Sequence, residues 1–364
     1  METSKVLFAD AKLEVLEQNK TLPAKFVRLF KELKLNNKLK GKEVGIKIHF
    51  GWGLNYTTIH PVFISALVKE IKAAGARTVK LMDDTAQNGI GRGYTREIVG
   101  CPVVCTFGET WKYGYKEKIG YETLDEVKFS GEALECDYLI NLSHVKGHGD
   151  CGFGGAIKNI AMGLVDDPAR RKLHRLEGGL AYNKKKCTLC LKCVKACRRQ
   201  AISYDKKNKE MKIFFHHCTY CQHCLLECPK GAITMNERNF DKFAKGMALV
   251  TNAFLKRFKP ENVTYINFLT NITVYCDCWG FSSPSLVPDI GILGSDNICA
   301  IDTASLDMIK TENLIENGLP KNRKLLDNNG HLFERIHGKN PYLMVNHLSK
   351  YSGFKTGYKI VEVK

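Results

Sequence analysis

Two cysteine runs, CTLCLKCVKAC at residues 187–197 and CTYCQHCLLECP at residues 218–229, determine how this chain is interpreted. Each run has the spacing C-x2-C-x2-C-x3-C, in which three thiolates of one short loop bind one cubic iron–sulfur cluster. Where a chain has two such runs, the fourth thiolate of each run binds the cluster of the other run. The sequence therefore predicts two 4Fe–4S clusters, each of which takes its fourth cysteine ligand from the other run.

This crossover of the fourth cysteine assigns every cysteine of the two runs to a cluster. The alternative is a pair of zinc sites, but four-thiolate zinc sites usually combine two CxxC pairs across a longer loop. We therefore favour iron–sulfur clusters. The first cluster is assigned to Cys187, Cys190, Cys193 and Cys228, and the second cluster to Cys218, Cys221, Cys224 and Cys197.

Length, composition and cysteine usage indicate a globular protein of a reducing compartment. The 364 residues are enough for two or three domains, and 44% of them are hydrophobic, as in proteins with a sizeable core. No apolar run reaches about 18 residues, so we expect no membrane span. The first residues also lack the pattern of a secretory signal. Cluster thiolates require a reducing environment, which predicts a cytoplasmic protein.

The chain is basic, and the charge is concentrated around the cysteine runs. The net charge is +17, and residues 184–245 hold fifteen Lys/Arg against five Asp/Glu, a balance of +10. A cluster with four thiolates carries about −2, so part of this excess is compensation. Because no nucleic-acid-binding motif accompanies the charge, nucleic acid is an unlikely ligand, and we expect a redox partner protein with an acidic surface.

Strands alternate with amphipathic helices on both sides of the cysteine runs. This alternation predicts an α/β fold with a mostly parallel sheet covered by helices. The discontinuous α/β domain would comprise residues 1–181 and 237–364, and residues 182–236 would form an inserted ferredoxin-like α+β domain with two clusters. Strands are predicted at residues 44–50, 78–82, 137–142, 263–269, 290–293 and 358–363, and helices at residues 23–35, 58–75, 156–164 and 300–316.

The loop after the strand at 137–142 is the densest polar segment, SHVKGHGDCGFGGAIKN at residues 143–159. Ligands of open α/β sheets bind just beyond the carboxyl ends of the strands, and glycines let backbone N–H groups approach them. A dinucleotide-binding loop and a purely structural turn are the alternatives. We predict catalytic roles for His144, Lys146 and His148, and cofactor or substrate binding by Gly152, Gly154, Gly155 and Lys158.

A second candidate segment is CDCWG at residues 276–280, which also follows a predicted strand. Cysteines two positions apart can bind a soft metal, contact a cluster or act as redox-active thiols. The alternative is that both thiols are ordinary core residues, although Asp277 between them is an unusual core residue. We predict catalytic roles for Cys276 and Cys278, with a further metal or bound cofactor at this pair.

Several stretches resemble one poorly characterised family, the iron–sulfur centre proteins of domain of unknown function 362 with a ferredoxin insert. They are VGIKIHFG (44–51), SHVKGHGDCGFGGAIKNIAMG (143–163), both cysteine runs, INFLTNIT (266–273), CDCWGFS (276–282) and VPDIGILGSDNICAID (287–302). The resemblance implies a cluster-bearing α/β protein with a redox role, and it supplies no substrate.

The leading hypothesis is an oxidoreductase in which the clusters pass electrons to a site near SHVKGH and CDCWG. The clusters would supply one-electron chemistry, and the protein would bind a small-molecule substrate of unknown identity. A non-catalytic electron carrier and a soft-metal handling protein are the alternatives. Because parallel strands gather their carboxyl ends at one edge, we expect His148 and Cys278 to line one pocket.

Overall fold

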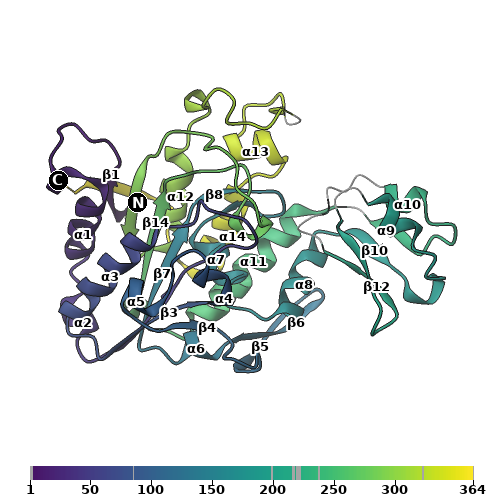
Figure 1. The fold of residues 1–364 in the computed structure, drawn as a ribbon, viewed down its shortest axis with the longest axis horizontal. Coiled ribbons are helices and arrows are strands. Elements are labelled where there is room, and N and C mark those ends of the chain that lie inside the picture. Colours follow the sequence, from purple (N-terminus) through teal and green to yellow (C-terminus); the bar gives the residue numbers. More distant parts are fainter. Residues whose placement is uncertain are drawn as a thin grey trace. The chain divides into compact units, whose positions relative to one another are not determined.

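The computed structural model describes residues 3–84, 86–197, 200–214, 218, 223–236, 238–321 and 324–363. The chain forms two compact units (Figure 1). Unit 1 comprises Met1–Arg170 and Ala244–Lys364, and unit 2 comprises Arg171–Phe243. Every helix in the described ranges is too short or too polar to span a bilayer.

An eight-stranded sheet forms the centre of unit 1 and confirms the predicted α/β class with a mostly parallel sheet. Within the described residues, β15 alone runs antiparallel to both of its neighbours, and the other pairings are parallel. The order across the sheet is β16 (Tyr358–Glu362), β1 (Ser4–Asp10), β15 (Gly291–Ser295), β14 (Val263–Leu269), β7 (Tyr138–His144), β2 (Glu43–Lys47), β3 (Thr78–Asp83) and β4 (Val103–Cys105).

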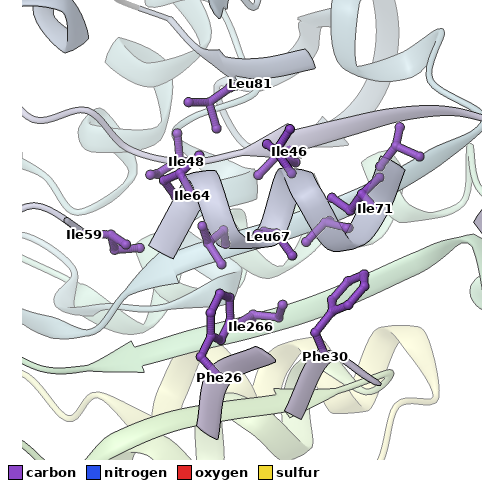
Figure 2. Packing of buried hydrophobic residues seen from close by; sticks show 14 of the residues in the cluster. Phe26, Phe30, Ile46, Ile48, Ile59, Ile64, Leu67, Ile71, Leu81 and Ile266 are labelled. Carbon is purple, nitrogen blue, oxygen red and sulfur yellow. The ribbon is translucent and has the colours of Figure 1, made fainter. Parts of the chain in front are cut away.

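Helices α1 (Leu22–Glu32) and α3 (Pro61–Ala73) cover one face of this sheet. Alternate residues of β2 and its extension, such as Ile46 and Ile48, point toward the apolar face of α3, as Figure 2 shows. Phe26 of α1 closes this core, in which burial of each such side chain contributes about 1.5–3 kcal/mol. Helix α3 starts at Pro61, a favoured first helical residue. The ring of His60, the residue before it, caps the helix by accepting the backbone N–H of Val62.

The opposite face carries α7 (Ala156–Ala161), α12 (Ile298–Met308) and α14 (Tyr342–Ser352). A buried polar residue, Asp302 of α12, connects this layer to the sheet. Its carboxylate accepts the Ala156 and Ile157 backbone N–H groups at 2.8 and 2.9 Å, and also the Asn267 amide of β14 at 2.8 Å. The aspartate therefore caps α7 from another helix and fixes the start of the segment that carries Lys158.

Several element boundaries differ from the sequence-based expectation. The strand predicted at residues 44–50 ends at Lys47, and the Phe50 N–H that follows donates to the Asp83 carboxylate rather than to a neighbouring strand. The helix predicted at residues 300–316 spans Ile298–Met308, because Ile309 has an extended backbone and a 3-10 turn follows. Strand β1 was not predicted.

Shorter elements complete unit 1. Two antiparallel hairpins are formed by β5 (Gly114–Tyr121) with β6 (Leu124–Ser130), and by β8 (Lys146–His148) with β9 (Gly152–Gly154). The β8–β9 hairpin follows β7 directly and carries much of the polar loop identified in the sequence. The remaining short helices include α2 (Asn36–Leu39), α4 (Ala86–Ile90), α5 (Arg96–Val99), α6 (Gly131–Leu134) and α13 (Leu332–His337).

Unit 2 is a small α+β arrangement around the cysteine runs. Strand β10 (Gly179–Tyr182) pairs antiparallel with β13 (Ile233–Asn236), and β11 (Ile202–Asp205) pairs antiparallel with β12 (Glu210–Ile213). Short helices α9 (Lys192–Ala196) and α10 (His223–Leu226) each carry cysteines of one run. Longer helices α8 (Asp167–Leu176) and α11 (Phe240–Leu255) include the ends of this unit. The apolar core includes Leu180, Ile202, Met211 and Ile233 together with Cys193 and Cys224.

Candidate functional site

Three side chains with metal-binding atoms meet at the carboxyl edge of the unit 1 sheet. His49 follows β2, while Cys276 and Cys278 belong to the turn that comes after β14. One ring nitrogen of His49 and the two sulfur atoms all lie within 4.8 Å of one another. This His–Cys–Cys group, defined as His49, Cys276 and Cys278, is chemically suited to a soft or borderline metal ion.

Asp83, the last residue of β3, orients the ring of His49. The His49 Nδ1 atom lies 3.1 Å from Asp83 Oδ2, so Nδ1–H donates to the carboxylate. Although burial would lower it, Asp83 and Cys276 raise the pKa of His49. Lys47, which is fully buried, neutralises the same carboxylate at 2.8 Å. Although burial alone would raise it, Lys47 and His49 hold the pKa of Asp83 well below its usual value.

Asp277, between the two cysteines, is the buried anchor of their turn. Its carboxylate accepts the amide of Asn55 at 2.7 Å and the hydroxyl of Thr57 at 3.3 Å, and it pairs with the ammonium of Lys146. The His144 ring donates Nε2–H to the Thr270 carbonyl, which leaves Nδ1 to accept from Lys146. The unusual acidic residue of the CDC segment is therefore structural.

This network also defines the position of two predicted catalytic residues. The side chains of His144 and Lys146 are 3% and 1% exposed, and both contact Asp277 rather than the two thiols. Burial, together with the positive charge of Lys146, lowers the pKa of His144 to about 3, so its ring is neutral. Burial also lowers the pKa of Lys146 to about 7. Both residues position the cysteine turn, and a direct catalytic role for either stays a prediction.

Lys158 and His148, by contrast, reach the sulfur atoms. The Lys158 ammonium lies 3.3 Å from Cys276 Sγ and 4.0 Å from Cys278 Sγ. His148 Nδ1 accepts the backbone N–H groups of Asp150 and Cys151, so Nε2–H donates to Cys278 Sγ at 3.4 Å. The structure thus brings His148 and Cys278 together, as expected from the arrangement of parallel strands.

The two thiols titrate as a pair. The hydrogen bond from the Cys278 thiol holds the pKa of Cys276 well below its usual value, with Lys158 and His49 adding to this effect against burial. As the donor of that bond, Cys278 has a raised pKa. Although burial would lower the pKa of Lys158, the nearby thiols raise it, so the lysine stays positively charged. The site therefore combines one ready thiolate with a fixed cation.

The three glycines predicted to bind a ligand have different environments. Gly154 adjoins the site, since a Cβ atom there would lie 3.9 Å from Cys276 Sγ. Gly152, with φ of 77°, adopts the left-handed conformation required by the β8–β9 turn. A Cβ atom on Gly155 would lie 2.7 Å from the Asp302 carboxylate, so close packing accounts for that glycine.

In unit 2, four cysteines line one pocket. They are Cys187, Cys190, Cys193 and Cys228, three from the first run and the last cysteine of the second run. This is the ligand set assigned from the sequence to the first cluster. A donor set of four thiolates around one space fits a 4Fe–4S cluster.

The backbone around these cysteines is arranged to support thiolates. Backbone N–H groups donate to the sulfur atoms of Cys187, Cys197 and Cys228 at 3.2–3.4 Å. Against the effect of burial, several such groups at residues 230–233 lower the pKa of Cys228. Leu189 and Leu191, with φ of 55° and 60°, hold the first loop in a left-handed conformation that side chains rarely adopt.

The second predicted cluster site is only partly described. Cys197, Cys218 and Cys224 belong to the core of unit 2, and Cys197 mirrors Cys228, because each sulfur accepts an N–H four residues later. Cys221, the remaining predicted ligand, lies outside the described residues. The assignment of this set stays a prediction.

Sequence reasoning missed His49, Asp83 and Lys47 as site residues. Their positions carry a usable signal, because β2 and β3 are parallel neighbours and both histidine and aspartate lie at their carboxyl ends. A search for polar residues at the carboxyl end of every predicted strand, and not only in glycine-rich loops, would have indicated them.

Comparison with known proteins identifies a family. The sequence matches the model of a domain of unknown function, DUF362, over residues 44–307. No curated protein matches the chain. Similar solved structures include the lactate racemase apoprotein from Thermoanaerobacterium thermosaccharolyticum, which has 12% sequence identity and a TM-score of 0.37, with the match covering 79% of this chain and 55% of that chain. Another is a structural-genomics protein from Thermotoga maritima, which has 10% identity and a TM-score of 0.37, with the match covering 70% of this chain and 52% of that chain. The chain thus spans about half the length of each. Because the family model covers most of the sequence, from β2 to α12, the chain belongs to the DUF362 family.

Proposed function

We propose that this protein is an iron–sulfur oxidoreductase, in which two 4Fe–4S clusters of unit 2 exchange electrons with a small molecule bound at the His–Cys–Cys group. When bound, the clusters supply one-electron transfer. The observation that supports this most strongly is the convergence of Cys187, Cys190, Cys193 and Cys228 on one cavity. The ferredoxin-like exchange of the fourth cysteine explains that convergence.

The residues of unit 1 support a reactive site rather than a passive fold. Lys158 is a fixed cation beside the thiols and is placed to hold an anionic group of a substrate. His148 donates a hydrogen bond to Cys278 and so stabilises negative charge on that sulfur. Lys146 and His144 hold the turn through Asp277. A simple electron carrier would need none of these groups.

The basic segment around the clusters suggests how electrons arrive. Residues 184–245 carry a balance of +10, which favours encounter with an acidic redox protein. We propose such a protein as the electron donor. Its on-rate should fall as ionic strength rises, because screening weakens the attraction between exposed charges.

The test uses anaerobically purified full-length protein whose clusters have been reduced with dithionite. A panel of small oxidants is added, and reoxidation of the clusters is followed by absorbance in wild type, Cys278→Ser and the control Cys105→Ser, whose half-buried thiol lies in β4. An oxidoreductase predicts at least one oxidant whose reaction slows in Cys278→Ser alone. Equal rates for every oxidant in all three proteins would instead establish a non-catalytic carrier.

A further inference from the structure

We infer that His49, Cys276 and Cys278 bind one divalent transition-metal ion of the zinc class and leave its fourth coordination position open. The inference deepens the proposed function, on which it rests for the role of this site, by naming what the site holds. Two thiolates and one imidazole form a donor set of the kind found in catalytic zinc sites with three protein ligands.

The spacing of the ligand atoms is compatible with one ion. Bonds of about 2.3 Å to sulfur and 2.0–2.1 Å to nitrogen separate the ligand atoms of a tetrahedral centre by about 3.5–3.8 Å. The three atoms here all lie within 4.8 Å of one another. Closure by at most about 1.3 Å, within reach of side-chain rotation, would therefore complete the coordination.

His49 is already prepared as a ligand. Its Nδ1–H donates to Asp83, and its Nε2 atom is buried without a hydrogen-bond partner among the described residues. A buried ring nitrogen without a hydrogen-bond partner is costly unless something binds it. A carboxylate behind a metal-binding histidine is the usual means of fixing its tautomer and orientation. Lys47 in turn holds Asp83.

The environment of the sulfur atoms indicates what occupies the open position. A divalent ion and two thiolates sum to zero charge, His49 ligates as the neutral ring, and the Lys158 ammonium adds +1 beside both sulfurs. The cysteine turn is held rigidly, because Asp277 is fully buried among polar partners. The preorganised site therefore favours an anionic ligand, such as a carboxylate, at the fourth position.

The experiment measures metal and sulfide in the same anaerobically prepared, full-length protein. After incubation with zinc and removal of the excess by gel filtration, wild type should retain about one zinc per chain more than His49→Gln and Cys278→Ser. The matched controls are His60→Gln, at the exposed start of α3, and Cys105→Ser, and both should retain the wild-type amount. Substitution with cobalt should give thiolate–cobalt absorption that is absent from His49→Gln.

Asp83→Asn provides a graded test, because loss of a partner behind a ligating histidine weakens metal affinity about 10–100-fold. Equal zinc retention in wild type and His49→Gln, or a Cys276–Cys278 disulfide detected by mass spectrometry of anaerobic samples, would overturn the inference. Inorganic sulfide separates the two proposals. Zinc dependent on His49 without sulfide would refute the clusters alone, and sulfide without such zinc would refute the metal site alone.

Discussion

Replacing Lys47 with methionine should destabilise unit 1 by about 3–5 kcal/mol, the usual effect of removing one partner of a buried ion pair. The Lys47 side chain is 0% exposed, and its ammonium donates to the Ile48 carbonyl at 2.6 Å, Asp83 at 2.8 Å and Asn159 at 3.0 Å. Methionine has a similar length and fills the space, so the loss comes from the buried carboxylate left without the lysine ammonium.

The assay is urea unfolding followed by tryptophan fluorescence, which reports on unit 1 because all three tryptophans, at positions 52, 111 and 279, lie there. Lys69→Met, at an exposed position of α3, should change the free energy of unfolding by less than about 0.5 kcal/mol. Adding Asp83→Asn to Lys47→Met should recover part of the loss. A loss below about 1 kcal/mol for Lys47→Met would refute the ion-pair reasoning.

Two further predictions concern the crossover of the fourth cysteine of each run and Asp302, which caps α7. Cys228→Ser and Cys190→Ser should perturb the same electron paramagnetic resonance signal of reduced protein, whereas Cys197→Ser should perturb the other; the pairing is wrong if Cys228→Ser and Cys197→Ser share a signal. Burial raises the pKa of Asp302 from 3.8 to about 6, so the folded state binds this proton more tightly than the unfolded state. The free energy of unfolding should therefore fall by about 2 kcal/mol as pH rises from 4 to 6, and Asp302→Asn should flatten this slope.

The cysteine runs and the sheet could be predicted from sequence because their signals are local. Four thiols within eleven residues, and strands bounded by turn residues, need no knowledge of distant contacts. Strand β1 escaped prediction, since a short N-terminal segment gains its identity from pairing with β15 and β16, near the other end of the chain. Such pairing has no local signature.

The site was predicted only in outline for a related reason. The glycine loop and the CDC segment were expected to meet because both follow parallel strands, and His148 does lie beside Cys278. His49 was missed because it occupies a polar position of an alternating strand pattern, where a metal ligand cannot be distinguished from an ordinary solvent-facing residue. Lys47 reads as a solvent-facing position of the same strand, yet helices cover both faces of this sheet and the lysine is buried.

The most direct test of the account is anomalous scattering at the iron absorption edge from crystals of anaerobically prepared protein. The account predicts two compact iron clusters in unit 2. One should be bound by Cys187, Cys190, Cys193 and Cys228, and the other by Cys197, Cys218, Cys221 and Cys224. Single tetrahedral zinc ions at these cysteines, with no iron signal, would contradict the redox function.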